Sequence, residues 1–167
     1  DLSTFAKALG AGFPLAMLTG RTEIMDLIGT GAVNHSGTYN SNVVSIVAGV
    51  AALQALSEND GELLTQIDRI GCALMSGLRE LGRKYGRNLY VSGVGAVFNT
   101  SFTDQQDVFD YASFRCAQDA PLKTFLEGLL VRGVRPTSRG TWFVSAAHTD
   151  TDVRETLAAA EEALGER

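Results

Sequence analysis

Apolar and polar residues follow a helical period through the middle of the chain. Between Gly61 and Tyr85, leucine and isoleucine recur at spacings of three and four, and charged residues lie off this stripe. The spacing predicts a long amphipathic helix that buries one face. The stretch Asn42–Ser57 is apolar on more than one face, so we predict a helix that Asn42 caps and that is buried nearly all round.

A strand-like pattern follows this helix. Leu89–Thr103 is rich in β-branched and aromatic residues with glycines inside, which predicts a strand pair or one kinked strand. Further along we predict helices over Ala120–Arg132 and Thr151–Leu164, and between them a strand over Thr141–Ala147. The order helix, strand, helix, strand, helix after residue 61 is typical of an α/β fold.

The N-terminal part carries weaker patterns. Leu15–Thr19 predicts a short strand, and Thr22–Ile28 predicts one or two helical turns. Gly29–Asn42 is rich in glycine, serine and asparagine without a period, which predicts a loop.

The composition is that of a globular protein, because 45% of the 167 residues are apolar, 20% are charged and the net charge is −5. An acidic chain with scattered arginines is a poor candidate for nucleic-acid binding, and no apolar run reaches the ~18 residues of a membrane span. The lone cysteines Cys72 and Cys116 argue against a disulfide framework and favour a reducing cytoplasm. Because the chain opens on Asp1 without a methionine, we expect a piece of a longer protein.

The segment "TFAKALGAGFP" places Lys7 among small residues and glycines. An enclosed lysine amine can attack carbonyl groups, and the glycines at Gly10 and Gly12 would let a bulky group approach the backbone. The alternative is a surface lysine on a short turn, which the spacing alone favours. A serine-x-x-lysine hydrolase motif is excluded because three residues separate Ser3 from Lys7.

Two polar loops are further candidate sites. The loop "HSGTYNSN" (35–42) precedes a predicted helix N-terminus, where hydroxyls and backbone amides form an anion site; the alternative is a loop that only caps the helix. Arg139 lies in the turn "RGVRPTSRG", and arginine binds carboxylates through two donors; the alternative is a solvated arginine. His35 and His148 lie far apart without partners at metal-ligand spacing, so we expect no metal site.

Taken together, these segments resemble the class III aminotransferases, which depend on pyridoxal phosphate, and above all the branch with the glutamate-1-semialdehyde aminomutases and β-amino-acid transaminases. "DLSTFAKALGAGFP" is similar to the family segment "PDL-T-x-x-K-x-x-GGG-x-P", with Ala11 in place of the middle glycine. "GTYNSN" resembles the "GT-x-x-x-N" loop, with Val43 where a proline often follows. "GVGAVFNTSFTD" and "RGVRPTSRGTWFVSAAHTDTDVRETL" resemble a small-domain strand and the family's C-terminal ending, so the likeness covers essentially the whole chain.

The resemblance implies roles for four residues. Lys7 resembles the catalytic lysine that forms the Schiff base with pyridoxal 5'-phosphate. Gly37 and Thr38 resemble the cofactor-binding loop, in which the threonine binds the phosphate across the interface of a homodimer with shared active sites. The place of Arg139 in "PTSRG" resembles a "SPRG" turn of β-amino-acid transaminases, whose arginine approaches the substrate carboxylate; aminomutases have no arginine there, which favours a transaminase.

The implied fold is α/β. It combines the rear part of a fold type I large domain (residues 1–60), which holds the lysine, with a C-terminal α+β small domain (residues 61–167). The family's glycine-rich phosphate loop, stacking aromatic residue and ring-nitrogen aspartate have no counterpart in this chain. The resemblance therefore implies the N-terminal half of the same protein as a partner.

The implied activity is transfer of an amino group between an amino acid, with a β-amino acid as one option, and an oxo acid. Two alternatives stay open: an aminomutase-type isomerase, which moves the amino group within one substrate, and a catalytically incomplete fragment. The expected ligands are small molecules, with neither nucleic acid nor a membrane as partner, and the expected location is the cytoplasm.

Overall fold

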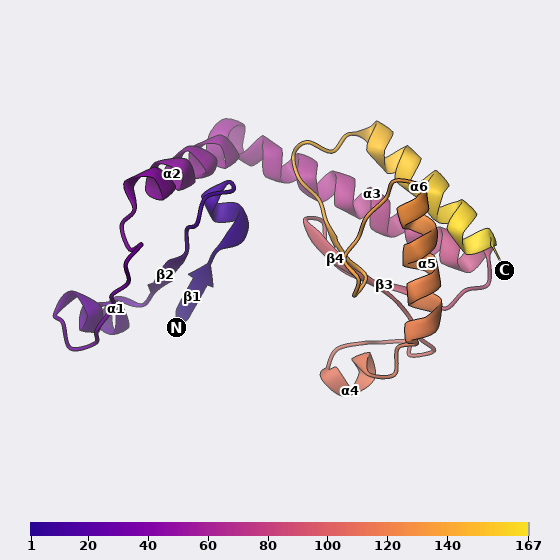
Figure 1. Cartoon of the computed structure of the whole chain (residues 1–167), viewed down its shortest axis with the longest axis horizontal. Helices are drawn as coiled ribbons and strands as arrows, with labels where there is room; N and C mark the ends of the chain where they lie inside the picture. Colours follow the sequence, from indigo (N-terminus) through magenta and orange to yellow (C-terminus); the bar gives the residue numbers. More distant parts are fainter. Residues whose placement is uncertain (167) are drawn as a thin grey trace. The chain divides into compact units, whose positions relative to one another are not determined.

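The computed structural model describes residues 1–166 and divides the chain into two compact units, Asp1–Leu63 and Leu64–Arg167 (Figure 1). Each unit contains its own antiparallel sheet. The division falls within the first turn of a long helix, α3 (Glu62–Lys84). This helix forms where the sequence predicts one, from about Gly61 to Tyr85.

The first unit is built on a two-stranded sheet in which β1 (Leu2–Phe5) pairs with β2 (Met17–Gly20). Strand β2 overlaps the predicted strand, whereas β1 has no sequence signal because four residues are too few to show a period. The other elements of the unit are the 3-10 turn η1 (Lys7–Gly10), helices α1 (Thr22–Gly29) and α2 (Val43–Ser57), and the 3-10 turn η2 (Glu58–Gly61).

Helix α2 forms where the sequence predicts it, and the side chain of Asn42 caps it by accepting a hydrogen bond from Ser45 N at 3.1 Å. The predicted burial of this helix is wrong. Ser45 and Gly49 are its only buried residues, while Val43 and Val47 expose 72% and 62% of their surface. The physical reason is that the unit offers one small sheet with its connecting loop, which can cover only one side of a helix.

The second unit contains a three-stranded sheet of β3 (Leu89–Val94), β4 (Val97–Phe102) and β5 (Thr141–Phe143), in the order β3-β4-β5. The stretch predicted as a strand pair or a kinked strand is therefore a strand pair. Strand β5 is shorter than the predicted Thr141–Ala147. It stops because a turn follows, in which His148 N donates to Ser145 O at 3.1 Å.

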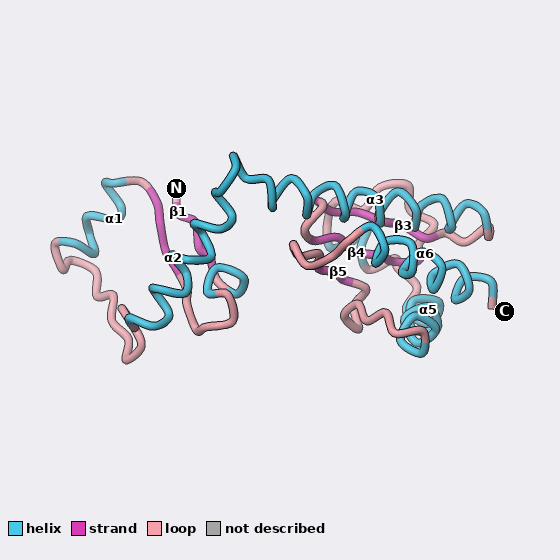
Figure 2. The backbone as a smooth tube through the Cα atoms, turned by 90° about the horizontal axis from the view of Figure 1, so that it is seen from above, coloured by secondary structure: helices cyan, strands magenta, loops and turns pink. Residues whose placement is uncertain are grey.

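Helices α3, α5 (Asp119–Val131) and α6 (Asp150–Gly165) share one hydrophobic core with the sheet, and the short α4 (Tyr111–Phe114) lies in the connection from β4 to α5 (Figures 1 and 2). The predicted stripe of α3 supplies core residues, and the rings of Phe98 and Trp142 stack with centroids 5.4 Å apart. Because alternate strand residues point to opposite faces, the neighbours Val97 and Phe143 point away from this core and are exposed. The sheet therefore has one packed face, and its other face is open at Val97 and Phe143, whereas Ser101 on that face is buried. The buried apolar residues are Ile70, Leu74, Met75, Leu78, Val91, Phe98, Phe102, Phe125, Leu129, Trp142, Val153, Ala159, Ala160, Ala163 and Leu164.

Candidate functional site

Lys7 lies at the start of the loop that joins β1 to β2, in the turn η1. Its backbone is left-handed, with φ = 59°, a conformation that costs a non-glycine residue about 1–3 kcal/mol. The side chain is exposed, and no hydrogen bond or ion pair joins its amine to another residue of the described range 1–166. Ala11, Ser41, Asn59 and Asp60 also have a positive φ, so what distinguishes Lys7 is an amine without a partner in the described range.

Glycines bring the Lys7 loop close to helix α2. Gly49 faces the loop, and a Cβ there would lie 2.4 Å from a methyl carbon of Leu15 and 3.4 Å from Leu9 O. Gly10 is buried, and a Cβ on it would lie 3.1 Å from the Leu15 Cβ. Both glycines therefore allow a close backbone approach, and η1 packs against the middle of α2 rather than projecting freely.

Gly37 and Thr38 lie in the loop that leads into α2. The loop folds back on itself, since Asn40 N donates to Gly37 O at 3.0 Å and Asn42 N donates to Tyr39 O at 3.1 Å. Thr38 is exposed, and its hydroxyl has no hydrogen-bond partner among residues 1–166. The loop does cap the helix, through Asn42, and it also leaves the Thr38 hydroxyl available to a ligand.

The structure does not bring Thr38 and Lys7 together within one copy of the chain. The Thr38 loop enters α2 at its N-terminal end, whereas η1 packs against the same helix around Gly49 (Figure 1). No described contact joins the two residues. If both act on one ligand, they do so from separate places in the first unit or from separate copies of the chain.

Arg139 belongs to the second unit and lies in a tight turn before β5. Gly140 N donates to Thr137 O at 2.9 Å, and Thr141 N donates to the Thr137 hydroxyl at 3.0 Å. Arg139 itself is exposed, and within the described range its guanidinium has neither a hydrogen bond nor an ion pair. The turn therefore presents a free two-pronged donor that can bind a carboxylate.

A buried hydroxyl ties this turn to the core. The Thr100 hydroxyl donates to Gly140 O at 3.2 Å and accepts from Trp142 Nε1 at 3.0 Å. Thr100 is fully buried, with 0% of its surface exposed. A Cβ at Gly140, where φ is 75°, would lie 2.2 Å from Thr100 O, so only glycine permits this approach.

Thr100→Val is expected to lower the free energy of unfolding by about 1–3 kcal/mol, because it leaves the buried indole N–H of Trp142 without an acceptor. Urea unfolding of the chain followed by tryptophan fluorescence measures the change. Thr124→Val is the matched control, since the Thr124 hydroxyl bonds only to Ala120 O on the exposed side of α5. Equal midpoints for the two variants would contradict the prediction.

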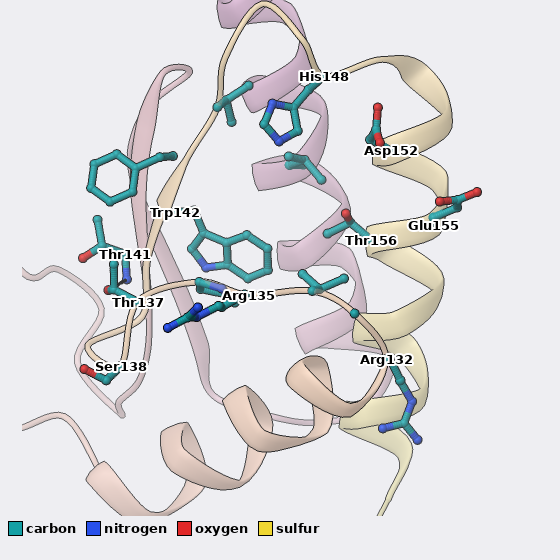
Figure 3. A pocket seen from close by; sticks show the side chains of 16 residues that line it. Arg132, Arg135, Thr137, Ser138, Thr141, Trp142, His148, Asp152, Glu155 and Thr156 are labelled. Carbon is teal, nitrogen blue, oxygen red and sulfur yellow. Dashed lines mark hydrogen bonds between the residues drawn. The ribbon is translucent and has the colours of Figure 1, made fainter. Parts of the chain in front are cut away.

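A cavity of about 700 Å³ lies on the helical side of the Arg139 turn. Figure 3 shows Trp142 in its wall, with Arg135 and Ser138 on the side of the turn and Asp152 and Glu155 on α6. Hydrogen bonds from the Thr149 hydroxyl and amide hold the pKa of Asp152 below its usual value. Arg139 does not line this cavity, so its guanidinium and the cavity are separate features of the unit.

Thiols and imidazoles contribute little to the site. Cys72 and Cys116 are free and exposed, and His148 bonds locally to Ser145. Over residues 1–166, no cluster of three or more His, Cys, Asp or Glu side chains could hold a metal ion. Within the same range, none of the helices combines the length and the apolar content needed to cross a bilayer.

Sequence reasoning did not identify the residues that hold the Arg139 turn. Asn99 and Thr100 are polar residues inside a strand of otherwise mostly apolar residues, "VFNTSF", and asparagine is depleted in strands. The asparagine inside a strand was therefore the sequence signal that could have drawn attention to these residues. It did not reveal the partners, because the bonds of Asn99 and Thr100 reach a turn about forty residues away.

Comparison with known proteins identifies a family whose model matches most of the chain. The family model of the class-III aminotransferases matches residues 1–161. The chain is 37% identical to a glutamate-1-semialdehyde 2,1-aminomutase of Methanothermobacter thermautotrophicus, over 98% of this chain and 39% of that protein.

Two solved structures show the same fold. The chain is similar to a β-phenylalanine aminotransferase from Variovorax paradoxus (30% identity, TM-score 0.87, 99% of this chain and 38% of that one). It is also similar to the PLP internal aldimine form of the FumI protein from Sphingopyxis sp. MTA144 (25% identity, TM-score 0.81, 99% of this chain and 36% of that one). The chain thus spans less than two fifths of the length of the proteins it matches.

Proposed function

Because the chain belongs to the class-III aminotransferase family, we propose that it is part of a pyridoxal-phosphate-dependent aminotransferase that moves an amino group between an amino acid and an oxo acid. The single observation that carries this proposal is Lys7. Its amine has no partner within residues 1–166, its backbone is left-handed, and its segment resembles the lysine segment of the family.

The residues present fit the cofactor. Lys7 would hold it by a covalent bond from Nζ, and the Thr38 hydroxyl, which has no partner within residues 1–166, would donate to the phosphate beside the backbone of Gly37. When bound, pyridoxal phosphate supplies an electron sink that stabilises negative charge on the carbon bearing the amino group. The remainder of a protein of the relatives' length would supply the phosphate loop and the ring-nitrogen aspartate.

Lys7 also moves the proton. With the cofactor bound, the Lys7 Nζ would act as the base that takes the proton from the amine-bearing carbon of the substrate, and it would return that proton later in the transfer. The small residues around Lys7 leave room for its side chain to swing between these positions, and the packing of η1 on α2 keeps the backbone in place.

A second copy of the chain completes the proposed site. Thr38 and Lys7 lie apart within one copy, and α2 exposes apolar residues that one unit cannot cover, among them Val43, Val44 and Val47. We propose a homodimer in which Thr38 of one copy binds the phosphate that is held by Lys7 of the other. The free thiols of Cys72 and Cys116 fit a location in the reducing cytoplasm.

The proposed amino donor is a β-amino acid, with Arg139 as the anchor of its carboxylate. The support is the guanidinium of Arg139, which has no partner within residues 1–166, and the 30% identity to a β-phenylalanine aminotransferase. An aminomutase is the second candidate, and the observation that favours it is the 37% identity to a glutamate-1-semialdehyde 2,1-aminomutase. The two candidates share Lys7 and differ in whether a second substrate is needed.

Steady-state kinetics of the family-length protein tests the proposal. A transaminase given β-phenylalanine and 2-oxoglutarate should follow a ping-pong pattern, with parallel lines in double-reciprocal plots. An aminomutase would turn over glutamate-1-semialdehyde without any oxo acid. A protein that binds no pyridoxal phosphate and turns over neither substrate would contradict both candidates.

Thr38→Val is expected to weaken cofactor binding by about 1–3 kcal/mol, because a hydrogen bond to a charged phosphate is lost. The measurement is the dissociation constant of pyridoxal phosphate from the family-length enzyme, obtained by titrating the apoenzyme. Ser36→Ala is the matched control, since it removes a neighbouring hydroxyl from the same loop. Unchanged affinity in the Thr38 variant would remove Thr38 from the phosphate site.

A further inference from the structure

The turn that carries Arg139 is held from both faces of strand β4. On the open face, Asn99 Nδ2 donates to Arg139 O at 2.9 Å. On the packed face, the next residue, Thr100, donates to Gly140 O through its amide at 2.8 Å and through its hydroxyl at 3.2 Å. Two consecutive residues of the strand therefore bind two consecutive carbonyl groups of the turn.

These bonds differ in what they support. Thr100 is fully buried and also bonds Trp142, so its hydroxyl belongs to the core of the unit. Asn99 lies opposite Thr141 in the ladder, on the face of the sheet where Val97 and Phe143 are exposed, and its side chain also donates to the Thr141 hydroxyl at 3.4 Å. Asn99 thus contributes to the position of the turn without contributing to the core.

The bond from Asn99 contributes to the direction of the Arg139 side chain. It holds the carbonyl of the peptide between Arg139 and Gly140, whose N–H donates to Thr137 O, and because peptide groups are planar the two bonds together fix the plane of this peptide. A fixed peptide plane restricts the backbone at Arg139 and so restricts the direction in which the Cβ and the guanidinium leave it. The side chain can then stay free of ion pairs and still point in one direction.

The chemistry of asparagine suits this position. Its amide is a neutral donor, so it can hold the carbonyl without bringing a negative charge near the guanidinium at the end of the same residue. An aspartate of the same shape would lack the donor and would supply a carboxylate that competes with a substrate for Arg139. A neutral donor next to an arginine without an ion pair is the arrangement that a carboxylate-binding turn requires.

We infer that Asn99 is a positioning residue for carboxylate recognition, acting through Arg139. This inference rests on the proposed function, in which Arg139 binds the substrate carboxylate. It assigns substrate selectivity to a strand residue that itself touches no substrate. In this inference the selectivity depends on the hydrogen bond between β4 and the turn, from Asn99 Nδ2 to Arg139 O.

A double-mutant cycle in the family-length holoenzyme tests the inference. The variants are Asn99→Ala, Arg139→Ala and the double variant, assayed with β-phenylalanine and with 1-phenylethylamine, which has the same skeleton without the carboxylate. Asn99→Ala should raise KM for β-phenylalanine about fivefold to tenfold, the effect of losing one neutral hydrogen bond, and leave kcat nearly unchanged. Asn99→Ala should leave kcat/KM for 1-phenylethylamine unchanged, and in the Arg139→Ala background it should have no further effect.

A binding experiment on the same variants does not depend on turnover. Calorimetry measures the dissociation constant of 3-phenylpropanoate, which carries the carboxylate and lacks the amino group.

Further variants sharpen the result. Asn99→Asp should raise KM for β-phenylalanine more than Asn99→Ala, because it adds a competing carboxylate. Thr141→Val removes only the second contact of Asn99 and should leave both substrates unaffected.

The outcomes separate the two proposals. Equal losses for both substrates, or an Asn99→Ala effect that persists without Arg139, would overturn the positioning role. If Arg139→Ala itself leaves KM for β-phenylalanine and the affinity for 3-phenylpropanoate unchanged, the proposed carboxylate anchor fails, and the positioning role fails with it. If Arg139→Ala weakens both and Asn99→Ala changes neither, only the positioning role is overturned.

Discussion

Replacing Lys7 with alanine is expected to reduce turnover by the family-length enzyme by more than about 10³-fold, the scale of losing both a positioned base and a covalent anchor. Within residues 1–166 no hydrogen bond or ion pair engages its amine, so the amine is available for this chemistry. The variant should also lose the visible absorbance band of the covalent bond between lysine and cofactor. The measurements are the single-turnover rate with β-phenylalanine and the absorbance spectrum of the purified protein.

The control for this change is Lys123→Ala, which removes an exposed lysine from the outer face of α5. It should leave the spectrum and the rate unchanged. Borohydride reduction followed by mass spectrometry should find the cofactor on the peptide that contains Lys7 in the wild type. Cofactor trapped on another lysine of the unaltered enzyme would show that Lys7 is not the anchor, and the proposed function would then lose its main support.

Arg139→Ala is expected to raise KM for β-phenylalanine by about 10- to 100-fold, which corresponds to a lost hydrogen-bonded charge pair of about 1.5–3 kcal/mol. The effect should be confined to substrates that carry a carboxylate, because the guanidinium has no structural partner within the described residues. Arg139→Lys should recover only part of the loss, since lysine cannot donate in the two-pronged geometry. Michaelis constants with β-phenylalanine and 1-phenylethylamine measure these effects.

Arg135→Ala is the matched control for Arg139, because it removes a guanidinium from the same connection that lines the cavity beside Trp142 instead (Figure 3). It should leave both Michaelis constants unchanged. If Arg135→Ala raises KM for β-phenylalanine and Arg139→Ala does not, the carboxylate is bound on the cavity side of the turn. The assignment of the two arginines would then be reversed.

Local patterns predicted most of the elements correctly. The leucine and isoleucine stripe of α3 shows its period over many turns, and the cap of α2 is local, since Asn42 bonds Ser45 three residues later. Strand β1 and the end of β5 were missed or misplaced. They depend on a partner strand or on a following turn, and neither is visible in a window of a few residues.

The burial of α2 shows where pattern reasoning fails. An apolar helix predicts that other parts of the molecule cover it, and for α2 this prediction is wrong. Within the first unit only Ser45 and Gly49 find cover along α2. The apolar surface of a helix follows from its own residues. Its burial depends on which other elements pack against it, and these lie elsewhere in the chain.

The sequence by itself determined the family of this protein, the identity of Lys7 as the candidate anchor and the ends of the long helices, because these follow from residue types at short and fixed spacings. The tertiary structure alone decided that Lys7 has a left-handed backbone and no partner among the described residues, that Thr38 lies away from it in the same copy, and that Asn99 holds the Arg139 turn. Hydrogen bonds and strain of this kind join residues that are distant in sequence, so they exist only once the chain has folded and brought those residues together.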